Sequence, residues 1–274
     1  MLKLAVVGAQ TLLGRELVKA LEDREASVLP LSTGALSPEQ EEGDLVVFAP
    51  EPALLEGLDL VILAADLEAP GLLEAFQGRI LDLRETHETD AKLEPMPLTG
   101  SWPTDHRVLR GRPALEQVLA LLPSLMKGIG ELAGTHLRSV AWMGDRGIDG
   151  LMTQTLALLK GDEPEVEPLG YRAAFEVVPV AARGSLMEVR VPVFHGDLLI
   201  LHLKAEEGRA LESLPAPQGV KWMEQPPTSR DVAVSAELLA HVAPDAQGQR
   251  AILTLGFDPI LWGVLRPVLR LLEL

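Results

Sequence analysis

The chain of 274 residues contains no cysteine and no asparagine. Without cysteine it can form no disulfide, no zinc–cysteine or iron–sulfur site and no thiolate nucleophile. Long apolar runs are also missing, because none approaches the roughly 18 residues that cross a bilayer. The apolar run at residues 2–7 is typical of a strand and lacks the charged start and cleavage site of a signal peptide. We therefore expect a cytoplasmic protein without a membrane segment.

Basic residues are few relative to acidic ones. The chain has 24 Lys and Arg against 40 Asp and Glu, which gives a formal net charge of −16. Such a chain repels phosphate backbones and anionic lipids, so we expect neither nucleic acid nor membranes as partners. Apolar side chains, in contrast, make up 47 % of all residues. That share and the length predict a sizeable core in one large or two ordinary domains.

The first half of the chain alternates short apolar runs with helical periodicity. A helix is predicted over residues 12–21, a short one at 70–76 and a longer one at 113–126. Strands that alternate with helices imply crossover connections and a parallel sheet. The predicted strands are residues 2–7, 27–31, 44–48, 58–65 and 79–83.

The second half has a different pattern. Alternation of apolar and polar residues at 174–180, 186–193 and 198–205 favours an antiparallel sheet. Further expected elements are strands at 136–143 and 251–257 and helices at 150–159, 206–214 and 260–272. The predicted organisation is therefore an α/β domain over residues 1–125, an α+β domain over 126–255, and a closing helix in 256–274 that packs back on the first domain.

Residues 8–14, with the sequence Gly-Ala-Gln-Thr-Leu-Leu-Gly, follow a strand and open a helix. In this setting a glycine turn directs backbone N–H groups and a helix N-terminus at a pyrophosphate. Thr11, however, stands where the pattern Gly-Ala-x-Gly-x-x-Gly has its middle glycine, and a β-branched side chain crowds such a turn. Two interpretations remain open, a dinucleotide site and a turn that only packs helix on strand. The candidate cofactor residues are Gly8, Gln10, Thr11, Leu12, Leu13 and Gly14.

The end of the second strand bears on the choice of cofactor. No acidic residue is present there to hold a ribose 2′-hydroxyl; the residues are Ser32, Thr33 and Gly34. The two hydroxyls, Ser32 and Thr33, favour a 2′-phosphate and hence NADP, although no Lys or Arg adjoins them. The sequence therefore predicts either a weakened NADP site or no cofactor.

Seven segments, in order along the chain, resemble the aspartate-semialdehyde dehydrogenase family. The most similar is Val-Arg-Val-Pro-Val-Phe-His-Gly-Asp at 189–197, against the family's Val-Arg-Val-Pro-Val-x-x-Gly-His. The others are Val-Val-Gly-Ala with Gly-Arg-Glu-Leu at 6–9 and 14–17, the apolar run 58–65, Gly-Arg-Ile-Leu-Asp-Leu at 78–83, the glycine-rich 144–150, Phe-Glu-Val-Val-Pro at 175–179 and Pro-Thr-Ser-Arg-Asp at 227–231.

The resemblance implies a Rossmann-like NAD(P)-binding domain followed by an α+β domain like the C-terminal one of glyceraldehyde-3-phosphate dehydrogenase. The family is a group of NADP-dependent oxidoreductases of amino-acid biosynthesis, which use a cysteine nucleophile, a histidine and an arginine that binds the substrate carboxylate. In this chain Arg190 matches that arginine, and Asp197 stands where the histidine is expected. The cysteine position falls within residues 109–116, near Arg112, and no nucleophile is present there.

Each of these candidates has an ordinary structural alternative. Arg190 can instead be a strand arginine paired with Glu176 or Glu188, and His195 is a conceivable substitute for the lost histidine. Residues 85–90 gather one histidine and three carboxylates, for which we expect a solvated loop rather than a metal site. No metal is therefore predicted.

Two hypotheses follow. In the first, the protein is a catalytically inactive relative of the family, a binding or subunit-type scaffold that forms a homodimer through the sheet of its second domain or binds another protein. In the second, it is an NADP-dependent semialdehyde dehydrogenase or other oxidoreductase with chemistry that needs no cysteine. Under either hypothesis a small-molecule ligand is compatible with Arg190 and Asp197.

Overall fold

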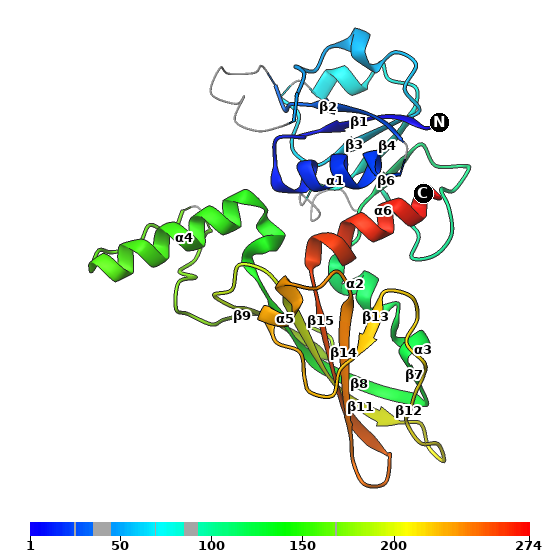
Figure 1. Ribbon diagram of the computed structural model, residues 1–274, viewed down its shortest axis with the longest axis vertical. Coiled ribbons are helices and arrows are strands. Elements are labelled where there is room, and N and C mark those ends of the chain that lie inside the picture. Colours follow the sequence, from blue (N-terminus) through cyan, green and yellow to red (C-terminus); the bar gives the residue numbers. More distant parts are fainter. Residues whose placement is uncertain (25, 35–44, 69, 85–92, 168) are drawn as a thin grey trace. The chain divides into compact units, whose positions relative to one another are not determined.

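The computed structural model describes residues 1–24, 26–34, 45–68, 70–84, 93–167 and 169–274 (Figure 1). The chain divides into two compact units. Unit 1 comprises Met1–Pro113 with Val264–Leu274, and unit 2 comprises Ala114–Gly263. No helix among the described residues combines the length and the apolar character needed to span a bilayer.

Unit 1 is built on the predicted parallel sheet. Its strand order is β2-β1-β3-β4-β6-β5, and every pairing in it is parallel. The apolar run at 58–65 forms the central strand β3, in which all four residues are buried, as a strand covered on both faces requires. The strands are β1 (Lys3–Val7), β2 (Ser27–Leu31), β3 (Leu60–Leu63), β4 (Arg79–Asp82), β5 (Glu94–Pro95) and β6 (Val108–Arg110).

Short helical segments accompany this sheet. Helix α1 (Leu12–Glu22) buries Leu17, Val18 and Leu21, and two 3-10 turns follow at Pro52–Leu55 and Pro70–Leu73. The strand expected at 44–48 is not formed by its described residues, 45–48, in which Phe48 makes only an isolated bridge to Leu31. Val46 is 71 % exposed, so this apolar stretch has no buried face to hold it in the sheet.

Unit 2 contains a seven-stranded mixed sheet in the order β13-β14-β15-β11-β8-β10-β9. Its pairings are antiparallel except β10 with β8 and β13 with β14, which agrees with the mostly antiparallel sheet predicted. The strands are β8 (Ile129–Arg138), β9 (Val178–Arg183), β10 (Leu186–Arg190), β11 (Asp197–Ala205), β13 (Val220–Trp222), β14 (Leu238–Pro244) and β15 (Arg250–Phe257), and β7 (Met126–Lys127) pairs separately with β12 (Glu212–Ser213).

Helices α2 (Ala114–Leu119) and α3 (Leu122–Leu125) belong to unit 2, whereas the sequence pattern assigned residues up to 125 to the first domain. The reason is packing, since Val118, Leu122 and Leu125 lie in one buried cluster with the apolar side chains of β11 and β15. Pro123, at the start of α3, separates the predicted single helix into two.

Three more elements differ from the expectation. The helix predicted at 206–214 is absent because its backbone bonds elsewhere: Leu211 N–H donates to Gly248 O, and Leu214 N–H to Leu125 O. The strand expected at 136–143 ends at Arg138 and is followed by a 3-10 turn, Val140–Met143. Phe175 has a φ of 60°, and strand β9 begins only at Val178 rather than at 174.

The remaining helices are α4, α5 and α6. Helix α4 (Asp145–Lys160) begins five residues before the predicted start and ends at Gly161, whose left-handed φ of 83° closes the helix. Helix α5 (Ser229–Ala233) begins with a capping box between Thr228 and Asp231. The last apolar stretch consists of a π-helical turn, Leu261–Leu265, and α6 (Arg266–Leu271). Residues from Val264 onward group with unit 1, where Arg270 Nη2 donates to Pro97 O.

Candidate functional site

The glycine turn of unit 1 lies between β1 and α1, as the sequence predicts. Gly8 has a φ of +81°, and its N–H and that of Ala9 both donate to Leu31 O, at 2.8 and 3.0 Å. A Cβ at Gly14 would lie 2.1 Å from Gly8 O, so the helix approaches the strand too closely for any side chain there. Both glycines are therefore required by packing, whether or not a ligand binds.

Thr11 is the N-cap of α1. Its Oγ1 donates to Gly8 O at 2.8 Å and accepts from Gly14 N–H at 3.1 Å. The threonine that departs from the dinucleotide pattern thus satisfies one of the N–H groups at the helix N-terminus that a pyrophosphate would otherwise engage. Leu12 and Leu13, the next two candidate residues, are half-buried in the first turn.

The residues after β2 do not form a phosphate cradle. Ser32 is 1 % exposed, and its hydroxyl donates to Gly34 O at 2.5 Å, so it is turned inward. Thr33 Oγ1 accepts from Gln10 Nε2 at 3.2 Å. The Ser32 hydroxyl is therefore turned away from a bound 2′-phosphate of NADP, and the Thr33 hydroxyl is already hydrogen-bonded. The two residues do not form the NADP phosphate site that the sequence predicts.

Glu68, from the loop after β3, is a candidate site residue that the sequence analysis does not include. Its Oε2 lies 1.9 Å from where a Cβ on Gly34 would be, and its N–H donates to Thr33 O at 2.8 Å. The carboxylate therefore lies at the end of β2, where dinucleotide-binding folds place an acidic residue. The contact between the loop after β3 and the loop after β2 brings Glu68 to this position, and no local sequence motif predicts it.

An ion-pair network follows β4 at the same edge of the sheet. Arg84 Nε and Nη2 donate to the two oxygens of Asp82 at 2.8 and 2.6 Å, and Nη1 donates to Asp66 at 2.9 Å. These bonds, those to Asp82 most of all, raise the pKa of Arg84. The guanidinium is thus committed to two carboxylates.

In unit 2, Arg190 belongs to a cluster of arginine and aromatic side chains. Its guanidinium carbon lies 4.7 Å from the ring centre of Tyr171 and 5.4 Å from that of Trp142. The guanidinium carbon of Arg138 also lies over the Trp142 ring, 3.9 Å from its centre. Glu188 Oε1 is 3.4 Å from Arg138 Nη1 and 4.0 Å from Arg190 Nε. Of the partners expected for Arg190, the structure therefore shows Glu188.

Glu176, the other expected partner of Arg190, pairs instead with Arg172 at 3.1 Å. Burial raises the pKa of Tyr171, although the nearby arginines Arg190 and Arg138 act in the opposite direction. Among the described residues, Trp142 Nε1, Tyr171 Oη and Arg190 Nε are buried without a hydrogen-bond partner. The cluster thus combines two guanidinium groups with buried donors that form no hydrogen bond within the described residues.

Asp197 is fully buried. It accepts hydrogen bonds from Ser139 N–H at 2.9 Å, from Ser139 Oγ at 2.7 Å and from His136 Nε2 at 2.8 Å. His136 is 3 % exposed and stacks on Phe257, with ring centres 5.9 Å apart. A carboxylate with no exposed surface and three donors already bound is placed to hold β8 and β11 together, not to exchange a proton with a ligand.

The other chemical candidates are spread over the chain. His195 is partly exposed, with Nδ1 3.9 Å from Asp258 Oδ2. Within residues 109–116, Arg112 Nε donates to Met96 O at 2.6 Å. The described residues include no group of three or more His, Asp or Glu able to hold a metal. The cluster at 85–90 lies outside the described residues.

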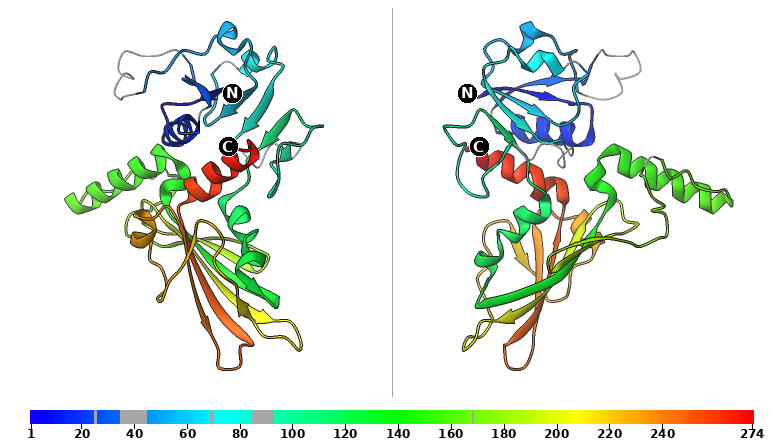
Figure 2. Two further views of the ribbon diagram at one scale, coloured as in Figure 1. Left: turned by 45° about the vertical axis from the view of Figure 1, so that its right-hand side comes forward. Right: turned by 180° about the vertical axis from the view of Figure 1, so that it is seen from behind.

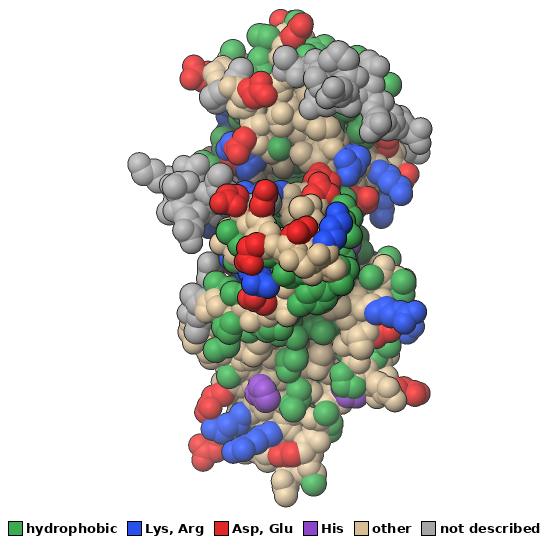
Figure 3. Space-filling model, turned by 90° about the vertical axis from the view of Figure 1, so that its left-hand side faces the viewer, with side chains coloured by type: hydrophobic (Ala, Val, Ile, Leu, Met, Phe, Trp, Pro, Cys, Tyr) green, Lys and Arg blue, Asp and Glu red, His purple; other side chains and the backbone are tan. Residues whose placement is uncertain are grey.

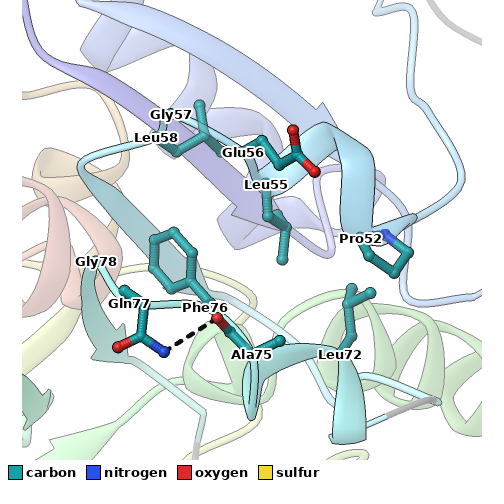
Figure 4. A pocket seen from close by; sticks show the side chains of 10 residues that line it. All are labelled: Pro52, Leu55, Glu56, Gly57, Leu58, Leu72, Ala75, Phe76, Gln77 and Gly78. Atoms are coloured by element: carbon teal, nitrogen blue, oxygen red, sulfur yellow. Dashed lines mark hydrogen bonds between the residues drawn. The ribbon is translucent and has the colours of Figure 1, made fainter.

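Two hollows that the described residues of unit 1 form lie at the amino ends of the strands. The first, of about 360 Å³, is lined by Leu55, Leu72 and Phe76 with Gln77 at its side (Figure 4). The second, of about 970 Å³, lies beside Leu2, Arg79 and Arg107. Neither includes a predicted site residue, and ligands of parallel α/β sheets bind at the opposite, carboxyl edge.

The two sheets together define a two-domain α/β protein with a Rossmann-like first unit. The chain matches several solved structures of aspartate semialdehyde dehydrogenases along nearly its whole length. It is similar to aspartate semialdehyde dehydrogenase II from Vibrio cholerae complexed with ASA, with a TM-score of 0.75, 19 % identity and coverage of 100 % of this chain and 97 % of that one.

A probable aspartate-semialdehyde dehydrogenase from Pseudomonas aeruginosa is similar to the same degree, with a TM-score of 0.73, 21 % identity and coverage of 98 % of this chain and 97 % of that one. No protein-family model matches the sequence, and no curated protein matches it either. At these identities the likeness shows a shared fold, which is the fold that the sequence motifs predict.

Proposed function

We propose that this protein is a non-catalytic relative of the aspartate semialdehyde dehydrogenases that acts by binding. The proposal rests on the residues found where the family has its catalytic cysteine and histidine. The chain has no cysteine, and Asp197, at the histidine position, is buried and bound to His136 and Ser139. A thiolate is both the nucleophile and the leaving group in thioester chemistry, and none is available here.

The scaffold retains groups suited to binding a small carboxylate. Arg190 matches the substrate-carboxylate arginine, and donors of Trp142, Tyr171 and Arg190 that have no hydrogen-bond partner among the described residues lie in one cluster. Glu188 offsets part of the positive charge, so a bound carboxylate would compete with it. Ligand binding without turnover is what this arrangement supports.

The first test is an assay for aspartate semialdehyde oxidation with phosphate and either NADP or NAD. We expect no turnover above background at micromolar protein, because no nucleophile can form the acyl intermediate. An authentic aspartate semialdehyde dehydrogenase in the same buffer serves as the positive control. Turnover proportional to protein concentration, and lost in Arg190→Ala, would contradict the proposal.

The partner that we propose is a second copy of the chain, which would cover an apolar surface on unit 2. On α4, Met152, Leu156 and Leu159 are 48, 49 and 71 % exposed at helical spacing. Phe175 and Val177, before the edge strand β9, are 67 and 62 % exposed.

The figures show where this surface lies. Helix α4 projects from the sheet of unit 2 in both views of Figure 2. Hydrophobic side chains gather on the side of the molecule shown in Figure 3. Exposed patches of this kind mark association surfaces.

Light scattering after size-exclusion chromatography tests this surface. We expect a dimer for the wild type and a monomer for the double variant Leu156→Glu, Leu159→Glu, because two carboxylates would be buried in the interface without partners. Val234→Glu is the matched control, since Val234 is 85 % exposed outside the patch. A monomeric wild type, or a double variant that stays dimeric, would refute the proposal.

The second candidate function is a nicotinamide-nucleotide-dependent oxidoreductase whose chemistry needs no cysteine. The carboxylate of Glu68, which lies at the end of β2 where dinucleotide-binding folds place an acidic residue, favours it. The proposed site for NADP is weak, because Thr11 caps the helix and Ser32 points inward. For either function we propose a cytoplasmic location, and recovery in the cytosolic fraction of its source cells tests it.

A further inference from the structure

The loop after β3 crosses the carboxyl edge of the parallel sheet in unit 1. Ala64 N–H donates to Val7 O at 3.0 Å, at the end of β1. The next residue, Ala65, has its Cβ only 2.6 Å from where a side chain on Gly8 would begin. Glu68 then bonds through its N–H to Thr33 O. Residues 64–68 therefore run from the glycine turn to the end of β2.

The side chains at the end of this loop present hydrogen-bond acceptors. The Glu68 carboxylate is exposed and lies against Gly34, where the absence of a Cβ leaves room for it. Gln10 Oε1 is buried and has no hydrogen-bond partner among the described residues, while its Nε2 is bound to Thr33 Oγ1. A ligand that satisfies these groups must donate hydrogen bonds.

The guanidinium of Arg84 at this edge is already paired with carboxylates. It is bound to Asp82 and Asp66. Among the described residues no ion pair joins Glu68 to a cation. A dianionic phosphate placed beside Glu68 would face a like charge, whereas a hydroxyl would find acceptors.

We propose that Glu68, with Gln10 and Thr33, forms a ribose subsite that accepts hydrogen bonds from a free 2′-hydroxyl and therefore selects NAD over NADP. The acidic residue that β2 lacks in the sequence is supplied by the loop after β3. This inference rests on the second candidate function, nucleotide binding, and it reverses the cofactor that Ser32 and Thr33 suggest.

Isothermal titration calorimetry of the full-length protein with NAD and with NADP tests the subsite. We expect the wild type to bind NAD at least about tenfold more tightly, as like-charge contacts cost that much or more. Glu68→Gln should bring the two dissociation constants within about threefold by removing the charge. Glu68→Lys should reverse the preference. Glu74→Gln is the control, an exposed carboxylate of unit 1 away from this edge, and it should retain the wild-type ratio.

Three results would overturn the inference. They are a wild type that binds NADP as tightly as NAD, a ratio that Glu68→Gln and Glu68→Lys leave unchanged, and no heat with either nucleotide at millimolar concentration. The last result would also remove the second candidate function. It would leave the non-catalytic binding function standing, since the turnover assay and the dimer measurement test that function separately.

Discussion

Replacing Asp197 by alanine is expected to lower the free energy of unfolding of unit 2 by about 3 kcal/mol or more, because each buried donor left without its acceptor costs about 1–3 kcal/mol. Three donors, Ser139 N–H, Ser139 Oγ and His136 Nε2, would lose their acceptor inside the protein. Their mutual positions also link β8 to β11, the strands at the centre of the sheet. Urea denaturation followed by tryptophan fluorescence measures the effect.

Asp197→Asn separates charge from shape. Its carbonyl oxygen can still accept from Ser139, but its amide would face the Nε2 proton of His136, so we expect an intermediate loss of stability. Asp162→Ala is the control, an exposed aspartate after α4. If Asp197→Ala were as stable as the wild type, the residue would be free for a chemical role, and the non-catalytic proposal would lose its main support.

Gly14→Ala is expected to destabilise unit 1 by up to about 3 kcal/mol, the range for forcing atoms into a close-packed contact. The added methyl would lie 2.1 Å from Gly8 O and 2.7 Å from Ala9 Cα, both backbone atoms that cannot swing aside. Helix α1 would have to move away from β1, which would also strain the Thr11 cap.

Gly71→Ala is the matched control, because no atom lies within 4 Å of the added methyl and the position is in the same unit. Limited proteolysis and the fluorescence of Trp102, which is 7 % exposed in unit 1, report on this unit. A Gly14→Ala variant as stable as Gly71→Ala would show that helix and strand are less closely packed than described. The glycine would then need a ligand-binding explanation.

Elements with strong local periodicity were predictable. The continuous apolar run at 58–65 predicts a buried central strand, and β3 is that strand. Helix α4 ends where Lys160-Gly161 predicts, because glycine alone adopts the left-handed closing conformation without strain. The helix expected at 206–214 failed, since hydrogen bonds to distant segments at Gly248 and Leu125 replaced the local ones.

The candidate site was predictable only in part. Glu188 as the partner of Arg190 follows from their spacing of two on one strand, which puts both on one face. The rings of Trp142 and Tyr171 beside Arg190 come from a turn and a loop whose positions the local pattern does not encode. Glu68 was missed for the same reason, because its contact with Gly34 joins two loops that are far apart in the sequence.

The amino-acid sequence by itself determined the absence of a cysteine nucleophile, the parallel sheet of unit 1 and the motifs shared with the dehydrogenase fold, because composition and short-range periodicity are local properties. The tertiary structure decided what the retained residues do. Asp197 became a buried acceptor through Ser139 and His136, which are 58 and 61 residues away in the chain. Thr11 became a helix cap, and Glu68 came to the end of β2, because burial and hydrogen bonding between distant segments determine which side chains remain open to a ligand.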